Sequence, residues 1–198
     1  MRILLPLAAA TLIATPAAAR DAPSPERLRG TVEKLVSFGT RHSLSSATDP
    51  RRGIGAARNW VAGEFVALSR QCGGCITVER LSRRFVVPRA PNGVVIEDIL
   101  GIQKGTDPNR FIIIGAHIDS RVTDVMNVTA DAPGANDDAS GVALVMEAAR
   151  ILSKEKFAAN IVYVAFSGEE QGLLGATLLA QTAKARGWQV DAMLNNDI

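Results

Sequence analysis

The second half of the chain alternates short apolar runs with longer segments in which apolar residues recur at helical spacing. The short runs over residues 111–116, 160–166 and 192–196 are typical of strands buried in a sheet, and the first is rich in β-branched residues. The segments over residues 139–154 and 173–185 separate these runs and predict amphipathic helices. This repeated order of strand, helix and strand predicts parallel strands in one sheet.

The first half of the chain has a different pattern. Residues 24–36, which begin with a serine that can cap a helix, and residues 56–68 both repeat apolar positions at helical spacing. Residues 76–87 and 94–102 predict two strands joined by a turn over residues 88–93. We expect these strands to form an antiparallel hairpin at one side of the sheet. The predicted fold class is therefore α/β with a mixed, largely parallel sheet.

The N-terminus has the pattern of a secretory signal peptide. Arg2 precedes an apolar run over residues 3–13 that is too short to span a bilayer comfortably, and small residues at 17–19 fit a cleavage site. An uncleaved anchor is disfavoured because no charged stop signal extends the run. Cleavage removes residues 1–19 and leaves a domain over residues 20–198. We expect a periplasmic or secreted protein with no stable membrane association after cleavage.

Composition and charge indicate one ordinary globular domain. Of the 198 residues, 47% are hydrophobic and 21% charged, which gives room for a sizeable core. The net charge of +2 is small and evenly spread, so neither nucleic acid nor an anionic membrane is an expected partner. The densest basic cluster, formed by Arg80, Arg83 and Arg84, is predicted to be a solvated strand edge.

The two cysteines, Cys72 and Cys75, lie close together in a single C-x-x-C motif. In a cytosolic protein this spacing would indicate redox chemistry or half of a zinc site. The motif follows an amphipathic helix instead of preceding one, and the chain has no second C-x-x-C. In an exported protein we expect a local disulfide that holds a turn.

Metal-ligand residue types follow each of the three predicted parallel strands. Parallel strands deliver the residues at their carboxyl ends to one edge of the sheet. The residues that reach this edge are His117, Glu169, Glu170 and Asp197, with Asp137 and Asp138 added from the segment before the next helix. Taken singly, an acid after a strand is usually a cap or turn residue. The joint pattern indicates a metal site.

The residue types also favour a particular metal. Imidazole with several carboxylates and no thiolate suits zinc, with manganese or cobalt as substitutes, and a carboxylate can bridge two ions. Asp119 is placed to accept the second N–H of the His117 ring. Of the adjacent Glu169 and Glu170, one can bind metal while the other acts as general base. His42, in a loop with no nearby carboxylate, is predicted to be a hydrogen-bonded loop histidine.

Four segments carry a resemblance to a known family. They read GAHIDS over residues 115–120, GANDDASG over 134–141, FSGEEQGLLG over 166–175, and Asn-Asp at 196–197. At these residues the chain resembles the co-catalytic zinc peptidases of the M28 type, secreted aminopeptidases among them. Residues 39–43 and 57–58 are similar to bacterial members as well, so the resemblance spans nearly all of the mature chain. It implies a three-layer sandwich with helices on both faces of the sheet.

The resemblance also implies roles for the metal ligands. His117 and Asp197 would bind one zinc ion, Glu170 would bind a second, and Asp137 would bridge the two. The peptide bond after Asp137 is cis in the family.

The chemistry follows from the same resemblance. Glu169 would be the general base and Asp119 the partner that orients the imidazole. The bridging water would attack the scissile carbonyl at the N-terminus of a peptide substrate. The implied activity is that of a zinc-dependent aminopeptidase.

The chain departs from the family at its C-terminus. Family members supply a second zinc-ligand histidine well downstream of the position of Asp197, whereas this sequence stops at Ile198 within an apolar strand. We therefore expect a domain that lacks its C-terminal part. Two ions are expected in the complete enzyme, and the 198-residue chain alone is expected to be inactive or weakly active.

Two further hypotheses belong to other functional classes. Glutaminyl cyclases are single-zinc acyltransferases that share this scaffold, so pyroglutamate formation is an alternative reaction. The chain could also be a non-catalytic fragment or a binding module that keeps the fold.

Overall fold

The computed structural model describes residues 21–198. The predicted signal peptide, residues 1–19, and its cleavage site lie outside the described residues. No helix within the described part of the chain is long and apolar enough to cross a membrane.

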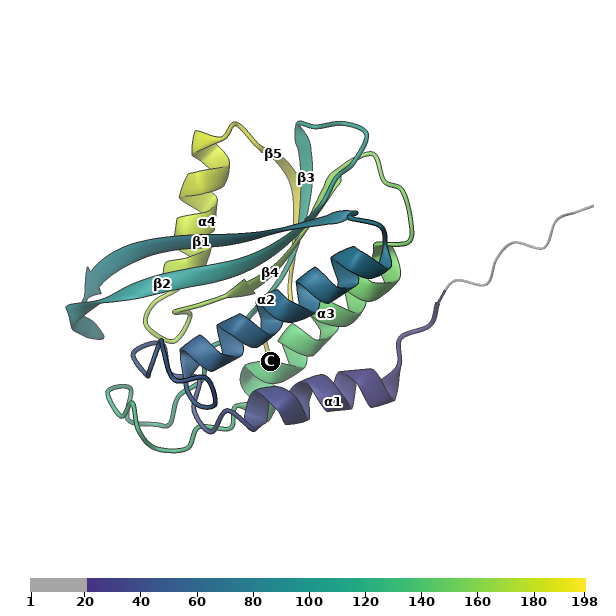
Figure 1. Cartoon of the computed structure of the whole chain (residues 1–198). Helices are drawn as coiled ribbons and strands as arrows, with labels where there is room; N and C mark the ends of the chain where they lie inside the picture. The colour runs from purple at the N-terminus through teal and green to yellow at the C-terminus, as the bar shows by residue number, and fades with distance from the viewer. Residues whose placement is uncertain (1–20) are drawn as a thin grey trace, which may run out of the picture.

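The centre of the structure is a five-stranded sheet with the strand order β1-β2-β4-β3-β5 (Figure 1). Strands β1 (Ile76–Val87) and β2 (Ala90–Gln103) pair antiparallel, and β2 pairs antiparallel with β4 (Asn160–Phe166). Strand β3 (Arg110–His117) lies parallel to both β4 and β5 (Gln189–Asn195). The predicted mixed sheet, its parallel strands and the hairpin at one side are confirmed.

Helices cover both faces of the sheet, which makes three layers (Figure 1). Helices α1 (Pro25–Val36), α2 (Ile54–Gln71) and α3 (Gly141–Leu152) share one hydrophobic cluster with one face of the sheet. Helix α4 (Leu174–Ala185) packs through Leu179 on the opposite face. The three-layer α/β class is confirmed.

Strand β4 shows how the apolar pattern produces this arrangement. All of its residues are buried, as expected for a central strand covered on both faces. Alternate side chains of a strand point to opposite faces. Those at 161, 163 and 165 join the cluster beneath α1, α2 and α3, whereas those at 162, 164 and 166 join the cluster beneath α4.

Every predicted element boundary lies within four residues of the observed one, and local structure explains three of the differences. The hairpin turn is shorter than residues 88–93, because β2 begins at Ala90, where Val87 pairs with it. Helix α3 begins at Gly141, because Asp137 and Asp138 have non-helical backbone angles. Strand β5 begins three residues before the predicted start, because the continuous apolar run that marked the strand begins only at Ala192, whereas pairing with β3 already begins at Gln189.

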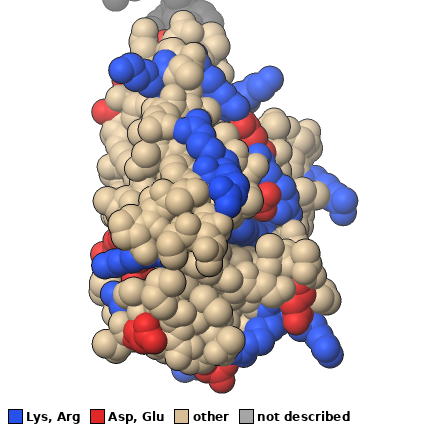
Figure 2. Space-filling model, turned by 90° about the vertical axis from the view of Figure 1, so that its left-hand side faces the viewer, with Lys and Arg blue, Asp and Glu red and all other residues tan. Residues whose placement is uncertain are grey.

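The basic residues of β1 lie on an edge strand of the sheet. Arg80 pairs with Glu97 at 2.7 Å, Arg83 contacts the side chain of Gln181, and Arg84 donates to a backbone carbonyl. The prediction of a solvated strand edge is confirmed. On the molecular face in Figure 2, the blue lysines and arginines form an irregular band interrupted by red acidic residues.

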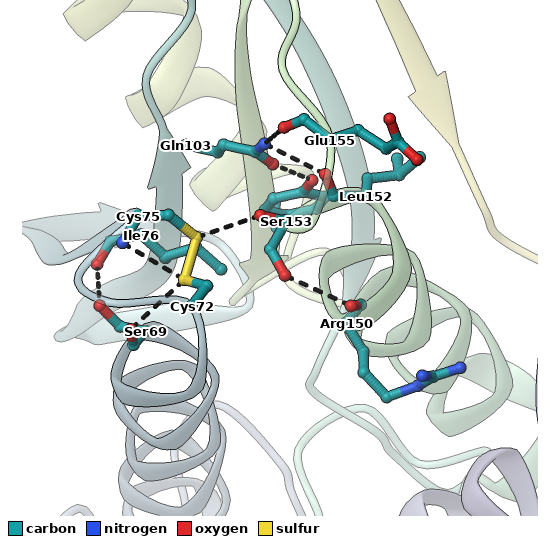
Figure 3. The surroundings of a disulfide bond; sticks show 10 residues. Ser69, Cys72, Cys75, Ile76, Gln103, Arg150, Leu152, Ser153 and Glu155 are labelled. Atoms are coloured by element: carbon teal, nitrogen blue, oxygen red, sulfur yellow. Dashed lines mark hydrogen bonds between the residues drawn. A yellow bond between two sulfur atoms is a disulfide. The ribbon is translucent and has the colours of Figure 1, made fainter. Parts of the chain in front are cut away.

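Cys72 and Cys75 form a disulfide that joins the end of α2 to the start of β1 (Figure 3). The Cys72 sulfur accepts the backbone N–H of Cys75 at 3.2 Å, and the Cys75 sulfur lies 3.4 Å from the carbonyl oxygen of Ser153. The predicted local bridge is confirmed. It lies where α3 ends, at the end of the sheet away from the carboxyl ends of β3, β4 and β5.

Candidate metal centre

Three predicted ligands come together at the carboxyl edge of the parallel strands. One ligand atom from each of His117, Asp137 and Asp197 lies within 4.8 Å of the other two. The Nε2 atom of His117 is 2.9 Å from Asp137 Oδ1 and 3.7 Å from Asp197 Oδ1. The imidazole is buried, whereas the two carboxylates open to solvent. A cation held between them would therefore be reachable from outside.

The sheet itself positions two of these ligands. His117 is the last residue of β3, and Asp197 follows the end of the neighbouring strand β5. Asn196 extends the pairing beyond β5, because its backbone N–H donates to the carbonyl of Gly115 at 2.9 Å and its side chain donates to the same oxygen at 3.1 Å. The short path from Asn196 to Asp197 then keeps the carboxylate beside the imidazole.

Asp138 anchors the turn that carries Asp137. Its buried carboxylate accepts the backbone N–H of His117 and the backbone N–H of Gly141, both at 3.0 Å. The peptide bond between Asp137 and Asp138 is cis, as the resemblance implies. Burial raises the pKa of Asp138 to about 6, and the nearby His117 partly offsets this effect. Asp138 therefore links β3 to the start of α3 and does not belong to the cluster of ligand atoms.

Asp119 connects the loop after His117 with the turn that carries Glu169 and Glu170. The atom closest to His117 Nδ1 is the carbonyl oxygen of Asp119 at 3.1 Å, whereas the Asp119 carboxylate is 3.7 Å away. That carboxylate accepts the Ser43 hydroxyl at 3.0 Å and the backbone N–H groups of Glu169 and Glu170, both at 3.2 Å. Complete burial would raise the pKa of Asp119, but these hydrogen bonds and the adjacent imidazole hold it below its usual value.

Glu169 shares a small cavity with the ligands. Its walls, which enclose about 50 Å³, include His117 and Asp197 together with apolar side chains such as Phe166 and Leu173. Burial raises the pKa of Glu169, and the neighbouring acidic groups add to this rise, although the nearby His117 acts against it. A carboxylate with a raised pKa at the edge of a ligand cluster suits proton transfer at neutral pH.

Glu170 takes a different position from the other predicted ligands. Its carboxylate forms an ion pair with Arg121, and its carbonyl accepts from Arg89 at 2.7 Å. It is not a member of the cluster formed by His117, Asp137 and Asp197. Its role as ligand to a second ion stays a prediction. The pattern of polar and apolar positions gave no indication of either arginine contact.

His42 is a buried loop histidine, as predicted. Its Nδ1 accepts the backbone N–H of Leu44 at 3.1 Å, and its Nε2 lies 3.0 Å from the carbonyl of Val125. Both ring nitrogens are thus engaged with the backbone, and the ring does not join the metal cluster.

Arg41 is a residue that the sequence did not single out. Its side chain is only 1% exposed, and its guanidinium donates to four backbone carbonyls. These acceptors are Leu35 at 3.2 Å, Ile118 and Pro133 at 2.7 Å, and Gly134 at 2.9 Å. Arg41 therefore ties the loop after His117 to the turn before Asp137.

The electrostatics of the cluster suit a divalent cation. Burial lowers the pKa of His117, but Asp119, Asp138 and Glu169 outweigh it and raise that pKa to about 10. The surplus negative charge that holds a proton on this ring would equally favour a metal ion, whose binding releases the proton. One imidazole and several carboxylates form a donor set that zinc accepts. The residues present therefore fit the group.

The structure is an α/β domain with a cluster of candidate metal ligands at the carboxyl edge of a mixed sheet. Residues 98–198, about half of the chain, match the model of peptidase family M28. The chain therefore belongs to peptidase family M28.

Curated relatives agree with this family. A probable zinc metalloprotease of Pyricularia oryzae is 51% identical over 176 residues, which cover 88% of this chain and 35% of the relative. A second, from Pyrenophora teres f. teres, is 49% identical over 180 residues, which cover 90% of this chain and 37% of the relative. The chain thus spans little more than a third of the length of these relatives.

Solved structures share the fold. LapB from Legionella pneumophila has a TM-score of 0.71 at 24% identity, over 88% of this chain and 43% of that one. A leucine aminopeptidase precursor from Bacteroides thetaiotaomicron has a TM-score of 0.72 at 20% identity, over 91% and 64%. A glutaminyl cyclase from the same organism also has a TM-score of 0.72 at 20% identity, over 90% and 63%. At these identities the likeness establishes the fold alone.

Proposed function

We propose that this chain carries the metal site of a zinc-dependent exopeptidase that removes residues from the N-terminus of peptides. The observation that carries the proposal is the convergence of His117, Asp137 and Asp197 beside Glu169. These three side chains would hold one zinc ion, and Asp137 with Glu170 would contribute to a second. Membership in peptidase family M28 and the zinc metalloprotease relatives support this assignment.

Zinc supplies Lewis-acid polarisation of a carbonyl and a lower pKa for water at neutral pH. The chain supplies the proton acceptor and the geometry. Glu169 accepts the proton of the attacking water and returns it to the leaving amine, which its raised pKa favours. Asp119 accepts the backbone N–H groups of both glutamates and so fixes their turn relative to the imidazole.

The disulfide favours an oxidising compartment as the place where this activity occurs. Bridges such as Cys72–Cys75 persist in oxidising environments. Together with the signal pattern of residues 1–19, this supports a periplasmic or secreted peptidase. Its expected partners are peptide substrates.

Hydrolysis of an aminoacyl p-nitroanilide tests the proposal. Zinc-loaded protein at the full length of its relatives, of which this chain spans little more than a third, should release nitroaniline. A chelator should abolish release, and added zinc should restore it. Glu169→Gln should lower kcat by about 10²- to 10⁴-fold with the zinc content unchanged, because only the proton acceptor is lost. Glu33→Gln, on the exposed face of α1, is the matched control and should have no effect.

The product separates this reaction from the alternatives. The glutaminyl cyclase and the leucine aminopeptidase precursor have the same TM-score, so the fold favours neither reaction. A glutaminyl peptide that yields pyroglutamate instead of free glutamine would favour cyclisation. Turnover of Glu169→Gln at the unsubstituted rate would reject the proposed base. A zinc-loaded protein without turnover of either substrate would be a binding module or a catalytically incomplete fragment.

A further inference from the structure

A further buried carboxylate lies next to the turn that carries Glu169, outside the cluster of metal ligands. Asp98, on β2, is completely buried, and its Oδ1 accepts the backbone N–H of Ser167 at 2.8 Å. Ser167 is the first residue after β4 and lies two positions before Glu169. Asp98 therefore holds the chain at the end of β4, where the turn that carries Glu169 begins.

The side chain of Ser167 is held as well. Arg58, which is 4% exposed on α2, donates from Nε to the Ser167 hydroxyl at 3.0 Å. The hydroxyl donates in turn to the carbonyl of Glu97 at 2.7 Å. Ser167 is thus fixed through its backbone N–H by β2, and through its hydroxyl by both α2 and β2.

This arrangement is costly, which argues that it serves a purpose beyond packing. Within residues 21–198, Asp98 Oδ2 and Arg58 Nη2 are buried without a hydrogen-bond partner. Burial also raises the pKa of Asp98 to about 7, although the Ser167 N–H and the positive charge of Arg58 act against this rise. An apolar residue at position 98 would avoid these penalties but would not hold Ser167.

The turn that carries Glu169 is packed closely against its neighbours on both sides of Ser167. Gly168 has a φ of +74°, and a Cβ atom there would lie 2.6 Å from Ile96. The backbone N–H of Gly175, at the start of α4, donates to the Ser167 carbonyl at 2.9 Å. A Cβ atom at Gly175 would lie 2.2 Å from Asp98 Oδ1, so α4 closes directly over the carboxylate.

We propose that Asp98, acting through Ser167 and supported by Arg58, is a positioning residue that sets the turn carrying Glu169 against the metal ligands. The inference rests on the proposed function, since it assigns Glu169 a proton to accept. Asp119 holds the same turn from the metal side through the N–H groups of Glu169 and Glu170. Asp98 holds its first residue through the N–H of Ser167, so buried carboxylates hold the turn at both ends.

Two substitutions at one position test the inference. Asp98→Ala removes the acceptor and should lower kcat by about 10- to 100-fold, because small displacements of a catalytic group cost this much. KM and zinc content should stay unchanged, since no metal ligand is altered. Asp98→Asn keeps a carbonyl oxygen for Ser167 and should recover kcat to within about threefold. Asp191→Ala, which removes an exposed aspartate paired with Arg110, is the matched control.

Hydrogen exchange gives a second readout that does not depend on turnover. The backbone N–H groups of Ser167, Glu169 and Glu170 should exchange faster in Asp98→Ala, while those in the centre of β4 keep their protection. If Asp98→Ala does not fold, Ser167→Ala serves in its place, because it removes the hydroxyl that Arg58 contacts. It should lower kcat with KM unchanged.

The outcomes separate this inference from the proposed function. No turnover by the unsubstituted zinc-loaded protein at the full length of its relatives would reject both. Turnover by the unsubstituted protein, with kcat of Asp98→Ala within twofold of it, would reject the positioning role alone. Equal losses in Asp98→Asn and Asp98→Ala would also overturn it, because the acceptor would then not be the property that matters.

Discussion

Arg41 allows a quantitative test of what holds the loop after His117 against the turn before Asp137. Arg41→Met keeps much of the aliphatic volume but removes the guanidinium. The carbonyls of Ile118 and Pro133 then lose their donor, whereas those of Leu35 and Gly134 each keep a backbone N–H donor. A buried acceptor left unpaired costs about 1–3 kcal/mol. Two such acceptors give an expected loss of about 4 kcal/mol in the free energy of unfolding. This loss is large for a domain whose total stability is about 5–15 kcal/mol.

Urea unfolding followed by circular dichroism measures this loss, with an unchanged m-value as the check that the unfolded states are comparable. The matched control is Arg52→Met in the same region. Arg52 bonds Thr129 at 2.8 Å and Asp131 at 2.7 Å, but its side chain is 43% exposed. Its loss should cost no more than about 1 kcal/mol. A loss below about 1.5 kcal/mol for Arg41→Met, or equal losses for both variants, would refute the argument that burial makes the Arg41 bonds decisive.

Two further predictions concern the wider fold. The folded-state pKa of Asp98, about 7, lies above its ordinary value of 3.8, so its contribution to stability is present at low pH and is lost as pH rises towards neutrality. The free energy of unfolding of Asp98→Asn, relative to that of the unsubstituted protein, should therefore increase between about pH 4 and pH 8. Urea unfolding at several pH values measures this difference. A difference that does not change with pH would contradict the argument from burial. Replacing Cys72 and Cys75 together with serine should lower the free energy of unfolding by no more than about 2 kcal/mol, because the closed loop is short. It should leave kcat unchanged, because the bridge lies away from the metal centre, and a loss of turnover in this double variant would contradict that separation.

The ligand residues could be predicted from sequence because their placement depends on topology. An apolar run predicts a strand, a crossover helix predicts a parallel partner, and parallel strands end at one edge. His117 and Asp197 required nothing more, since they follow the neighbouring strands β3 and β5. The same reasoning predicted β4 at its observed bounds, because all its residues are buried.

The supporting residues could not be predicted in this way. Arg41 and Asp98 act through backbone carbonyls and N–H groups that are distant in sequence, and no spacing rule identifies those partners. Asp138 was expected at the metal edge, but its carboxylate faces the N–H groups of His117 and Gly141, which depends on the local backbone of residues 137 and 138. The start of β5 was missed because its first residues are not part of the continuous apolar run, which begins only at Ala192.

The most direct test of the metal centre is anomalous diffraction at the zinc edge from crystals of the zinc-loaded protein. The structure predicts a peak within about 2.0–2.2 Å of His117 Nε2 and of carboxylate oxygens from Asp137 and Asp197. The absence of a peak at these three residues at stoichiometric zinc, whether or not another peak appears elsewhere on the protein, would contradict the account.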